Sequence, residues 1–209
     1  MNMVIQKNKI IRNGGCIKSK LDGTEWKWNT KFENLPETYS YVSVMPEVLD
    51  QGKSFKCVCY SLTAYLDWLM GRIEGDNVSD NFDIDKLYSI RARKDVEGMS
   101  MKEALHYLRH IGLNNVKIQG YAKVNSIDSL KSALISNGPC CAGLMIKDMK
   151  RPDFWNGNKN YGGHAVLIVG YNKNGFIIRN SWGKSFADEG YTVIPYNEFN
   201  KIIEIWTIF

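Results

Sequence analysis

Residues 50–61 read DQGKSFKCVCYS, and a helical pattern begins inside this run. From Cys57 to Met70 apolar side chains recur at helical spacing, and we expect Gly71 to end the helix. Cys57 therefore opens the first strong helix of the chain. Because the dipole and free N–H groups of a helix N-terminus stabilise negative charge, this position favours a thiolate. Cys57 is the first candidate nucleophile.

Gln51, six residues before Cys57, adds a hydrogen-bond donor to the candidate site. A loop that folds back over the helix start would place its amide NH2 beside the backbone N–H of Cys57. Two such donors can form an oxyanion hole. Thiol catalysis also needs a base beside the nucleophile and a group that fixes the ring of that base.

His164 and Asn180 are the candidates for these two roles. His164 begins a strand-like run after two glycines, Asn180 ends the next one, and Asn174-Gly175 between them predicts a type I′ hairpin. Antiparallel neighbours bring such positions together in space. Asn180 would then accept the imidazole N–H and set the tautomer, and Trp182 would shield that bond from water.

The chain divides into a helical first half and a strand-rich second half. Helical patterns cover a segment through Arg93 that Asp83 or Asp85 would cap, residues 100–111 with a capping box, and residues 126–137. Strand patterns cover 140–146, 164–171, 176–180, 190–194 and 202–209. Residues 1–34 read as loosely structured or as an edge strand, and residues 35–50 as extended. This order predicts an α+β fold with two lobes, and a cleft between lobes is a common active-site position.

Composition excludes several classes of protein. The 209 residues are 44% hydrophobic and 23% charged, which is ordinary for a globular protein. The net charge of +5 is spread along the chain, so we expect no nucleic-acid partner. No segment is apolar enough for a signal peptide or a membrane span, so we expect no membrane partner and a cytoplasmic location. Abundant Lys, Asn and Ile hint at a bacterial or phage origin, and a phage-encoded protein could be virion-associated.

The remaining cysteines and histidines predict neither a disulfide framework nor a metal site. The five cysteines are odd in number and lack zinc-type spacing: Cys16, Cys57, Cys59, Cys140 and Cys141. We expect Cys59, Cys140 and Cys141 to lie in the core. His106 and His110 stand four apart on a helix, but no third ligand is evident, so a solvated face is the better interpretation. We therefore expect no cofactor and no metal.

Three blocks of residues, in order, resemble the papain family of cysteine peptidases. Residues 51–57 resemble its Gln-Gly…Cys block, GHAV at 163–166 with VGY at 169–171 its histidine block, and NSWG at 180–183 with Gly190-Tyr191 its asparagine block. The resemblance covers about residues 35–209. It implies a helical lobe at 51–122 carrying Cys57, a β-barrel-like antiparallel lobe made of 35–50 and 123–209 carrying His164 and Asn180, and an N-terminal extension at 1–34.

The resemblance also implies a polypeptide substrate lying extended across the cleft, bound by Gly98, Met99, Gly163 and Trp182. The chain departs from the family pattern at two positions near the nucleophile. Ser54 stands where many members have a disulfide cysteine, which suits a reducing compartment, and Val58 stands where they have Trp. Residues 1–34 are short for the inhibitory propeptide of the family. The partners that we consider therefore include an inhibitory segment or a separate inhibitory protein.

Three functions are compatible with these residues. The first is a cysteine endopeptidase that hydrolyses peptide bonds through a Cys57 acyl-enzyme, with His164 as base and acid. The second is a transpeptidase or crosslinking enzyme, in which an amine replaces water; related enzymes of that kind typically have Asp in place of Asn180. The third is a catalytically silent peptide-binding or structural protein, a class that usually loses the nucleophile or the histidine.

Overall fold

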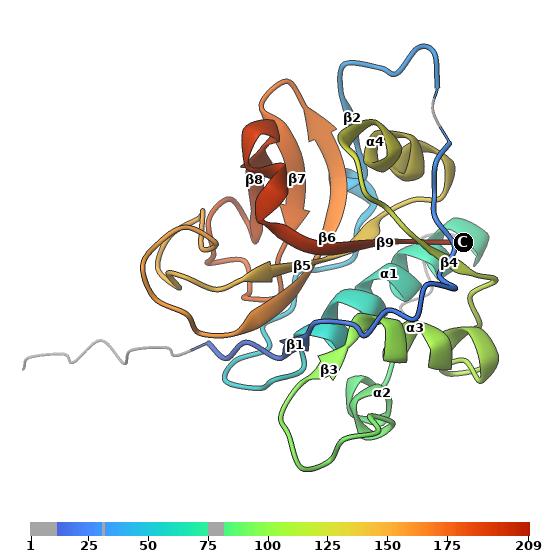
Figure 1. Cartoon of the computed structure of the whole chain (residues 1–209), viewed down its shortest axis with the longest axis vertical. Coiled ribbons are helices and arrows are strands. Elements are labelled where there is room, and N and C mark those ends of the chain that lie inside the picture. The colour runs from blue at the N-terminus through green and yellow to red at the C-terminus, as the bar shows by residue number, and fades with distance from the viewer. Residues whose placement is uncertain (1–11, 31, 75–81) are drawn as a thin grey trace, which may run out of the picture.

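The computed structural model describes residues 12–30, 32–74 and 82–209, so part of the predicted 1–34 extension lies outside it. Helices and sheet occupy different parts of the molecule (Figure 1). The helices α1 (Cys57–Glu74), α2 (Ile84–Ser89) and α3 (Met101–His110) lie together beside the sheet, whereas α4 (Ile127–Ser136) stands apart from them. The predicted α+β class is confirmed.

A seven-stranded antiparallel sheet forms the second part of the described chain. Its order is β4-β9-β5-β6-β7-β8, and β2 pairs with β6. The strands are β2 (Tyr39–Ser40), β4 (Tyr121–Lys123), β5 (Cys140–Met145), β6 (Gly163–Asn172), β7 (Gly175–Arg179), β8 (Tyr191–Pro195) and β9 (Ile202–Ile208). Two short segments, β1 (Cys16–Ile17) and β3 (Met99–Ser100), form a separate parallel pair. The described chain also contains two 3-10 helices, at Val42–Val44 and Tyr196–Lys201.

The capping residues explain where most helices begin. The side chains of Asp83, Ser100 and Ser126 accept hydrogen bonds from backbone N–H groups of the first turns of α2, α3 and α4. Two expected helix ends are wrong. α1 continues through Gly71 to Glu74, because one glycine costs a helix only about 1 kcal/mol. α2 ends at Ser89 rather than at residue 93.

The hairpin between β6 and β7 is confirmed, but its predicted turn type is wrong. Asn172 pairs with Gly175, so the loop residues are Lys173 and Asn174, and neither has the positive φ that a type I′ turn requires. Gly175 is needed for another reason. A Cβ at this position would lie 2.1 Å from the carbonyl oxygen of Ile194 on β8, so only glycine permits this approach of the strands.

Strand β6 is buried on both faces and separates two hydrophobic clusters. Ala165, Leu167 and Val169 belong to the cluster that contains α1 and α3, whereas Val166 and Ile168 belong to the cluster that contains α4. This alternation follows from the period of two in a strand. It directs His164 and Ala165 to opposite faces, and that difference positions the site described below.

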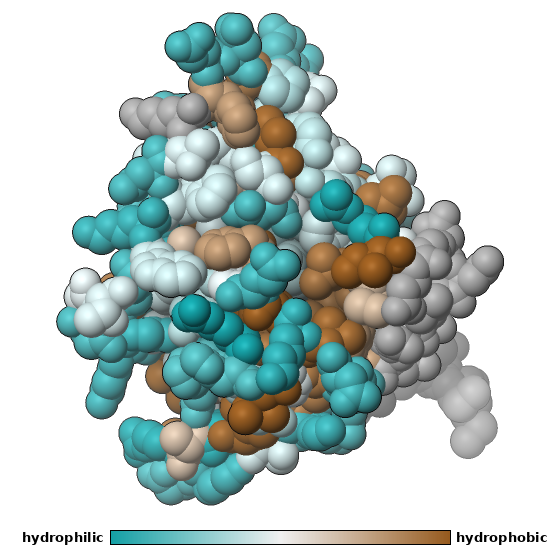
Figure 2. All heavy atoms as spheres, turned by 90° about the vertical axis from the view of Figure 1, so that its right-hand side faces the viewer, coloured by the Kyte–Doolittle hydropathy of each residue, from teal (hydrophilic) through white to brown (hydrophobic). Residues whose placement is uncertain are grey.

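The surface of the molecule is mixed in character. Figure 2 shows one face, on which hydrophilic residues surround several separate apolar groups. Within the described ranges, no helix combines the length and the apolarity needed to cross a bilayer.

Candidate active site

Cys57 is the first residue of α1 and is fully buried. Burial raises the pKa of its thiol, and backbone N–H groups of Ala165, Gly15 and Val58 act in the opposite direction. The thiol therefore lies next to the backbone of β6, one residue beyond His164. Gly15 is far from both elements in the sequence but lies against the Cys57 thiol in the fold.

His164 and Asn180 are in direct contact. His164 Nε2 lies 2.7 Å from Asn180 Oδ1, which also accepts the backbone N–H of Ser181 at 2.8 Å. Because a side-chain amide oxygen only accepts, the Nε2 atom carries the proton of the neutral ring. The other ring nitrogen, Nδ1, is buried and has no hydrogen-bond partner in the described chain. This tautomer leaves Nδ1 as the basic nitrogen.

Aromatic side chains enclose this pair. The Trp182 ring stacks on His164 with ring centroids 4.9 Å apart, and Phe154 meets the same imidazole edge-on at 5.6 Å. Burial lowers the pKa of His164 to about 4, and the hydrogen bond to Asn180 acts against that shift. In the described state the imidazole is neutral at pH 7.

Gln51 is buried and its amide is held at both ends. Its Oε1 atom accepts the Ser181 hydroxyl at 2.7 Å, which fixes Nε2 on the other side. Nε2 donates to the carbonyl oxygens of Ser54 at 2.8 Å and Asn13 at 3.3 Å. The amide of Gln51 thus donates to a backbone carbonyl of the N-terminal part of the chain.

Residues 12–20, here called the cover segment, lie across the candidate site. β1 pairs in parallel with β3, and Met99 N donates to the carbonyl oxygen of Gly15 at 2.8 Å. On the other side, a Cβ at Gly163 would lie 2.2 Å from the carbonyl oxygen of Cys16. The cover segment therefore fits between the helical part of the chain and the start of β6.

Arg12 anchors one end of the cover segment. Its guanidinium makes a two-point contact with the Asp50 carboxylate, with Nη2 at 2.8 Å from Oδ2, and Nη2 also donates to the Trp182 carbonyl oxygen at 3.1 Å. The side chain of Arg12 is 8% exposed and that of Asp50 44%. Such fork-shaped contacts to a carboxylate are both strong and geometrically specific.

The four residues predicted to bind peptide have different surroundings in the structure. Gly98 and Gly163 border the cover segment, and neither has room for a Cβ against it. Met99 contributes only its backbone there, because its side chain is buried against the Cys59 thiol. Trp182 is buried over His164, and its carbonyl oxygen accepts a hydrogen bond from Arg12 of the cover segment.

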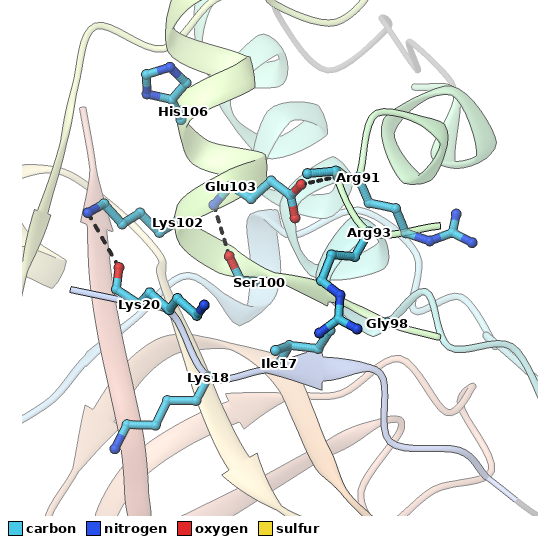
Figure 3. Close-up of a pocket in the computed structure, with 11 residues that line it drawn as sticks. Ile17, Lys18, Lys20, Arg91, Arg93, Gly98, Ser100, Lys102, Glu103 and His106 are labelled. Atoms are coloured by element: carbon cyan, nitrogen blue, oxygen red, sulfur yellow. Dashed lines mark hydrogen bonds between the residues drawn. The ribbon is translucent and has the colours of Figure 1, made fainter. Parts of the chain in front are cut away.

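A cavity of about 480 Å³ lies beside the second half of the cover segment (Figure 3). Ile17 and Gly98 line it, and α3 forms one wall with Lys102, Glu103 and His106. Further basic side chains complete the lining: Lys18, Lys20, Arg91 and Arg93.

Sequence reasoning missed the cover segment together with its anchor. Arg12 and Asp50 carry no motif, and the contacts of the segment are mostly between backbone atoms. One signal was available, the adjacent Gly14-Gly15 pair. A Cβ on Gly15 would lie 1.9 Å from the Phe55 carbonyl oxygen, and one on Gly14 would lie 2.7 Å from the Gly162 carbonyl carbon.

The residues described by the structure include no group of three or more potential metal ligands. His106 and His110 pack against each other on α3 with ring centroids 4.3 Å apart. All five cysteines are free thiols, and Cys59, Cys140 and Cys141 are buried as expected.

Comparison with known proteins identifies what this chain is similar to. The model of the family described as "Papain family cysteine protease" matches residues 85–205, more than half of the chain, although this range does not include Cys57. Among curated proteins, Cysteine proteinase 3 of Entamoeba histolytica is 28% identical over 211 aligned positions, covering 79% of this chain and 64% of the relative. Mouse cathepsin K is 23% identical and covers 79% and 61%.

Solved structures show the same fold. Xylellain, a cysteine protease from Xylella fastidiosa, superposes with a TM-score of 0.80 at 20% identity and covers 98% of both chains. Procathepsin L 3 of Tenebrio molitor superposes with a TM-score of 0.69 at 19% identity, over 94% of this chain and 75% of that one. The predicted papain-like fold is confirmed. The chain spans less than two thirds of the length of the curated relatives it matches first.

Proposed function

Because the chain belongs to the papain family of cysteine proteases, we propose that it is a cysteine endopeptidase with Cys57 as nucleophile. The observation that carries the proposal is the buried His164–Asn180 pair, whose tautomer leaves the basic Nδ1 nitrogen free. The Ala165 N–H places the Cys57 thiol beside the same short stretch of β6. Polypeptides are the substrate class that the family implies.

The proposed reaction has two stages. Nδ1 of His164 takes the proton of the Cys57 thiol, the thiolate attacks the peptide carbonyl carbon, and the imidazolium protonates the leaving amine as the C–N bond breaks. Water then gives a proton to His164 and attacks the thioester, which releases the carboxylic acid and regenerates the thiol. The Gln51 amide and the Cys57 N–H hold the oxyanion in both stages.

We infer that the cover segment is the inhibitory segment of this enzyme. The Asn13 carbonyl oxygen accepts from the Gln51 amide, and the Gly15 N–H lies against the Cys57 sulfur, so the segment occupies two positions that a substrate needs. In this closed arrangement, burial raises the pKa of Cys57 and lowers that of His164. Both shifts favour the neutral thiol and imidazole over the reactive ion pair, so the segment must move before catalysis.

Hydrolysis of a fluorogenic protein substrate tests the proposal. The wild-type chain, Cys57→Ala and Cys59→Ala are compared, with circular dichroism as a check of folding. Cys59 is a matched control because it is a buried cysteine of the same helix. We expect hydrolysis by the wild type and by Cys59→Ala, and none by Cys57→Ala. Equal turnover by all three chains would overturn the assignment of the nucleophile.

A further inference from the structure

Two cysteines from different parts of the chain lie near each other in the closed site. Cys57 begins α1, and the N–H groups of Gly15 and Ala165 lie against its sulfur. Cys16 is the residue after Gly15 and belongs to β1 of the cover segment. Both cysteines are free thiols. The segment that closes the site therefore carries a second thiol, one residue away from its contact with the proposed nucleophile.

The Cys16 side chain points inward, towards the part of the sheet that contacts Cys57. Its Cβ lies 3.6 Å from the position that a Cβ would take on Gly163, and its Sγ lies 3.6 Å from the corresponding position on Gly143. Gly163 and Ala165 share one face of β6, because positions two apart in a strand do so, and Gly143 on β5 pairs with Ala165. The Ala165 N–H lies against the Cys57 sulfur. The same small area of the sheet thus borders both thiols.

Both thiols are protected while the site is closed. Cys16 packs against the buried cluster that contains Cys57. Burial raises the pKa of the Cys16 thiol, and the neighbouring Cys57 adds to that shift. Burial likewise raises the pKa of Cys57. Because the thiolate is the form that reacts, oxidation of either cysteine has to begin when the cover segment moves away and Cys57 lies exposed at its helix N-terminus.

Cys141 is the alternative partner for Cys16, since it lies two residues before Gly143 on the same face of β5. Its sulfur lies 3.1 Å from that of Met101 on α3, and both side chains are fully buried. Cys57, in contrast, contacts the cover segment itself through Gly15. Movement of the segment therefore opens Cys57 to an oxidant and leaves Cys141 in the core.

We propose that Cys16 and Cys57 form a redox modification site, in which a reversible disulfide holds the cover segment over the candidate active site. The oxidant is a peroxide. With the segment open, the Cys57 thiolate attacks one oxygen of hydrogen peroxide, the O–O bond breaks and hydroxide leaves, so that Cys57 becomes a sulfenic acid. With the segment closed, the Cys16 sulfur attacks the Cys57 sulfur, the S–S bond forms, the S–O bond breaks, and the thiol proton leaves with the hydroxide as water.

The disulfide has two consequences for the protein. It keeps the chain inactive until a thiol reductant restores both cysteines, and it protects Cys57 from irreversible damage. A sulfenic acid that meets no thiol is oxidised further to a sulfinic acid, which common thiol reductants do not reverse. The inference rests on the proposed function of Cys57 and of the cover segment, and it adds a form of regulation to that function.

Peptide mapping of the oxidised full-length chain tests the proposal directly. The reduced chain is treated with hydrogen peroxide, the remaining thiols are alkylated, and the products of trypsin digestion are analysed by mass spectrometry. We expect a disulfide-linked pair of peptides, residues 13–18 and 57–72, that separates on reduction. Because the second peptide also contains Cys59, Cys59→Ala should retain the linked pair and Cys57→Ala should lose it. A disulfide between other cysteines, or oxidation without a disulfide, would overturn the proposal.

A second measurement follows the recovery of Cys57 after oxidation. Each chain is treated with peroxide and then with dithiothreitol, and its labelling by an epoxysuccinyl peptide is compared with that of the same chain before treatment. We expect the wild type to recover most of its labelling, and Cys16→Ser to recover several-fold less, because its Cys57 is oxidised further. Cys140→Ala, a buried cysteine on the opposite face of β5, should recover like the wild type. Equal recovery by the wild type and Cys16→Ser would overturn the protective role of Cys16.

Peptide mapping keeps this inference separate from the proposed activity, because the linked peptides are detected whether or not the chain hydrolyses a substrate. We expect the reduced wild type to hydrolyse a fluorogenic protein substrate and the oxidised wild type to lose that activity until dithiothreitol is added. A Cys16–Cys57 disulfide in a chain whose reduced form shows no hydrolysis would refute only the peptidase activity. An active chain that forms no such disulfide under peroxide would refute only the redox modification site.

Discussion

At the scale of single residues, the contact between His164 and Asn180 does most to define the chemistry. The Asn180 oxygen fixes the proton on Nε2, and two aromatic rings keep water away from this bond. A hydrogen bond in such surroundings is stronger than one in water. The same surroundings make the imidazole costly to protonate, which links the site to the stability of the protein.

Removing the Asn180 amide should therefore impair catalysis more than folding. In Asn180→Ala the imidazole can adopt either tautomer and rotate, so we expect kcat to fall by roughly 10²-fold, within the range that general acid–base catalysis contributes. Steady-state hydrolysis of a fluorogenic peptide measures this. Asn180→Gln retains an amide oxygen and should recover part of the rate, and a kcat equal to that of the wild type in Asn180→Ala would contradict the orienting role.

The buried imidazole also predicts a dependence of stability on pH. The pKa of His164 is about 4 in the folded chain and about 6.5 in an unfolded one, so the unfolded state binds more protons between these values. This contribution to stability is complete above pH 6.5 and is lost as the pH falls towards 4. The full difference corresponds to about 3 kcal/mol.

Urea unfolding of the wild type and His164→Gln from pH 7.5 to 4.5 measures this contribution. We expect the free energy of unfolding of the wild type, relative to that of the variant, to fall as the pH is lowered. Parallel curves for the two chains would show that His164 is not buried in the neutral form.

At the scale of elements, the cover segment and β3 form the contact that closes the site. Sequence patterns predicted α3 from its capping box and α4 from a helical run ended by Gly138, and the structure shows a capping serine at the start of each. They could not predict the cover segment, because its hydrogen bonds are made by backbone atoms such as the Gly15 carbonyl, which any sequence supplies. The hairpin that joins His164 to Asn180 was predictable, whereas its turn type depended on the approach of β8.

Weakening the anchor of the cover segment should activate the enzyme. Arg12→Ala removes a nearly buried guanidinium from Asp50 and from the Trp182 carbonyl. We expect the rate of Cys57 alkylation by a peptide epoxide to rise by roughly tenfold, because a charged hydrogen bond contributes about 1.5–3 kcal/mol and Asp50 is partly hydrated. The exposed Lys184–Glu47 pair supplies the control, Lys184→Ala, which should leave the rate unchanged. Slower alkylation of Arg12→Ala would argue against an anchoring role.

Alanine substitutions at two glycines test how closely the cover segment fits against Phe55. A Cβ on Gly15 would overlap the Phe55 carbonyl oxygen, so Gly15→Ala should displace the segment and speed alkylation of Cys57. Gly71 lies within α1 with open space around it, so Gly71→Ala should raise the free energy of unfolding by up to about 1 kcal/mol and leave alkylation unchanged. Differential scanning fluorimetry and timed mass spectrometry measure both effects. Unchanged alkylation in Gly15→Ala would contradict the fit.

At the scale of the whole molecule, the sheet brings together groups that are far apart in the sequence. β6 brings its backbone beside Cys57, and β7 leads to Asn180. The family resemblance predicted both from local blocks of residues. The pairing of β5 with β9 could not be predicted in this way, because its register shifts between Gly143 and Leu144.

The identity of the nucleophile is tested most directly by intact-mass spectrometry after brief exposure to an epoxysuccinyl peptide. The wild type, Cys57→Ala and Cys59→Ala are treated with a small excess of the reagent. We predict one adduct on the wild type and on Cys59→Ala, and none on Cys57→Ala, because Cys57 lies at a helix N-terminus and against the backbone of Ala165, the residue after His164. An adduct that persists in Cys57→Ala, or that spreads over several cysteines of the wild type, would contradict the assignment of Cys57 as the catalytic thiol.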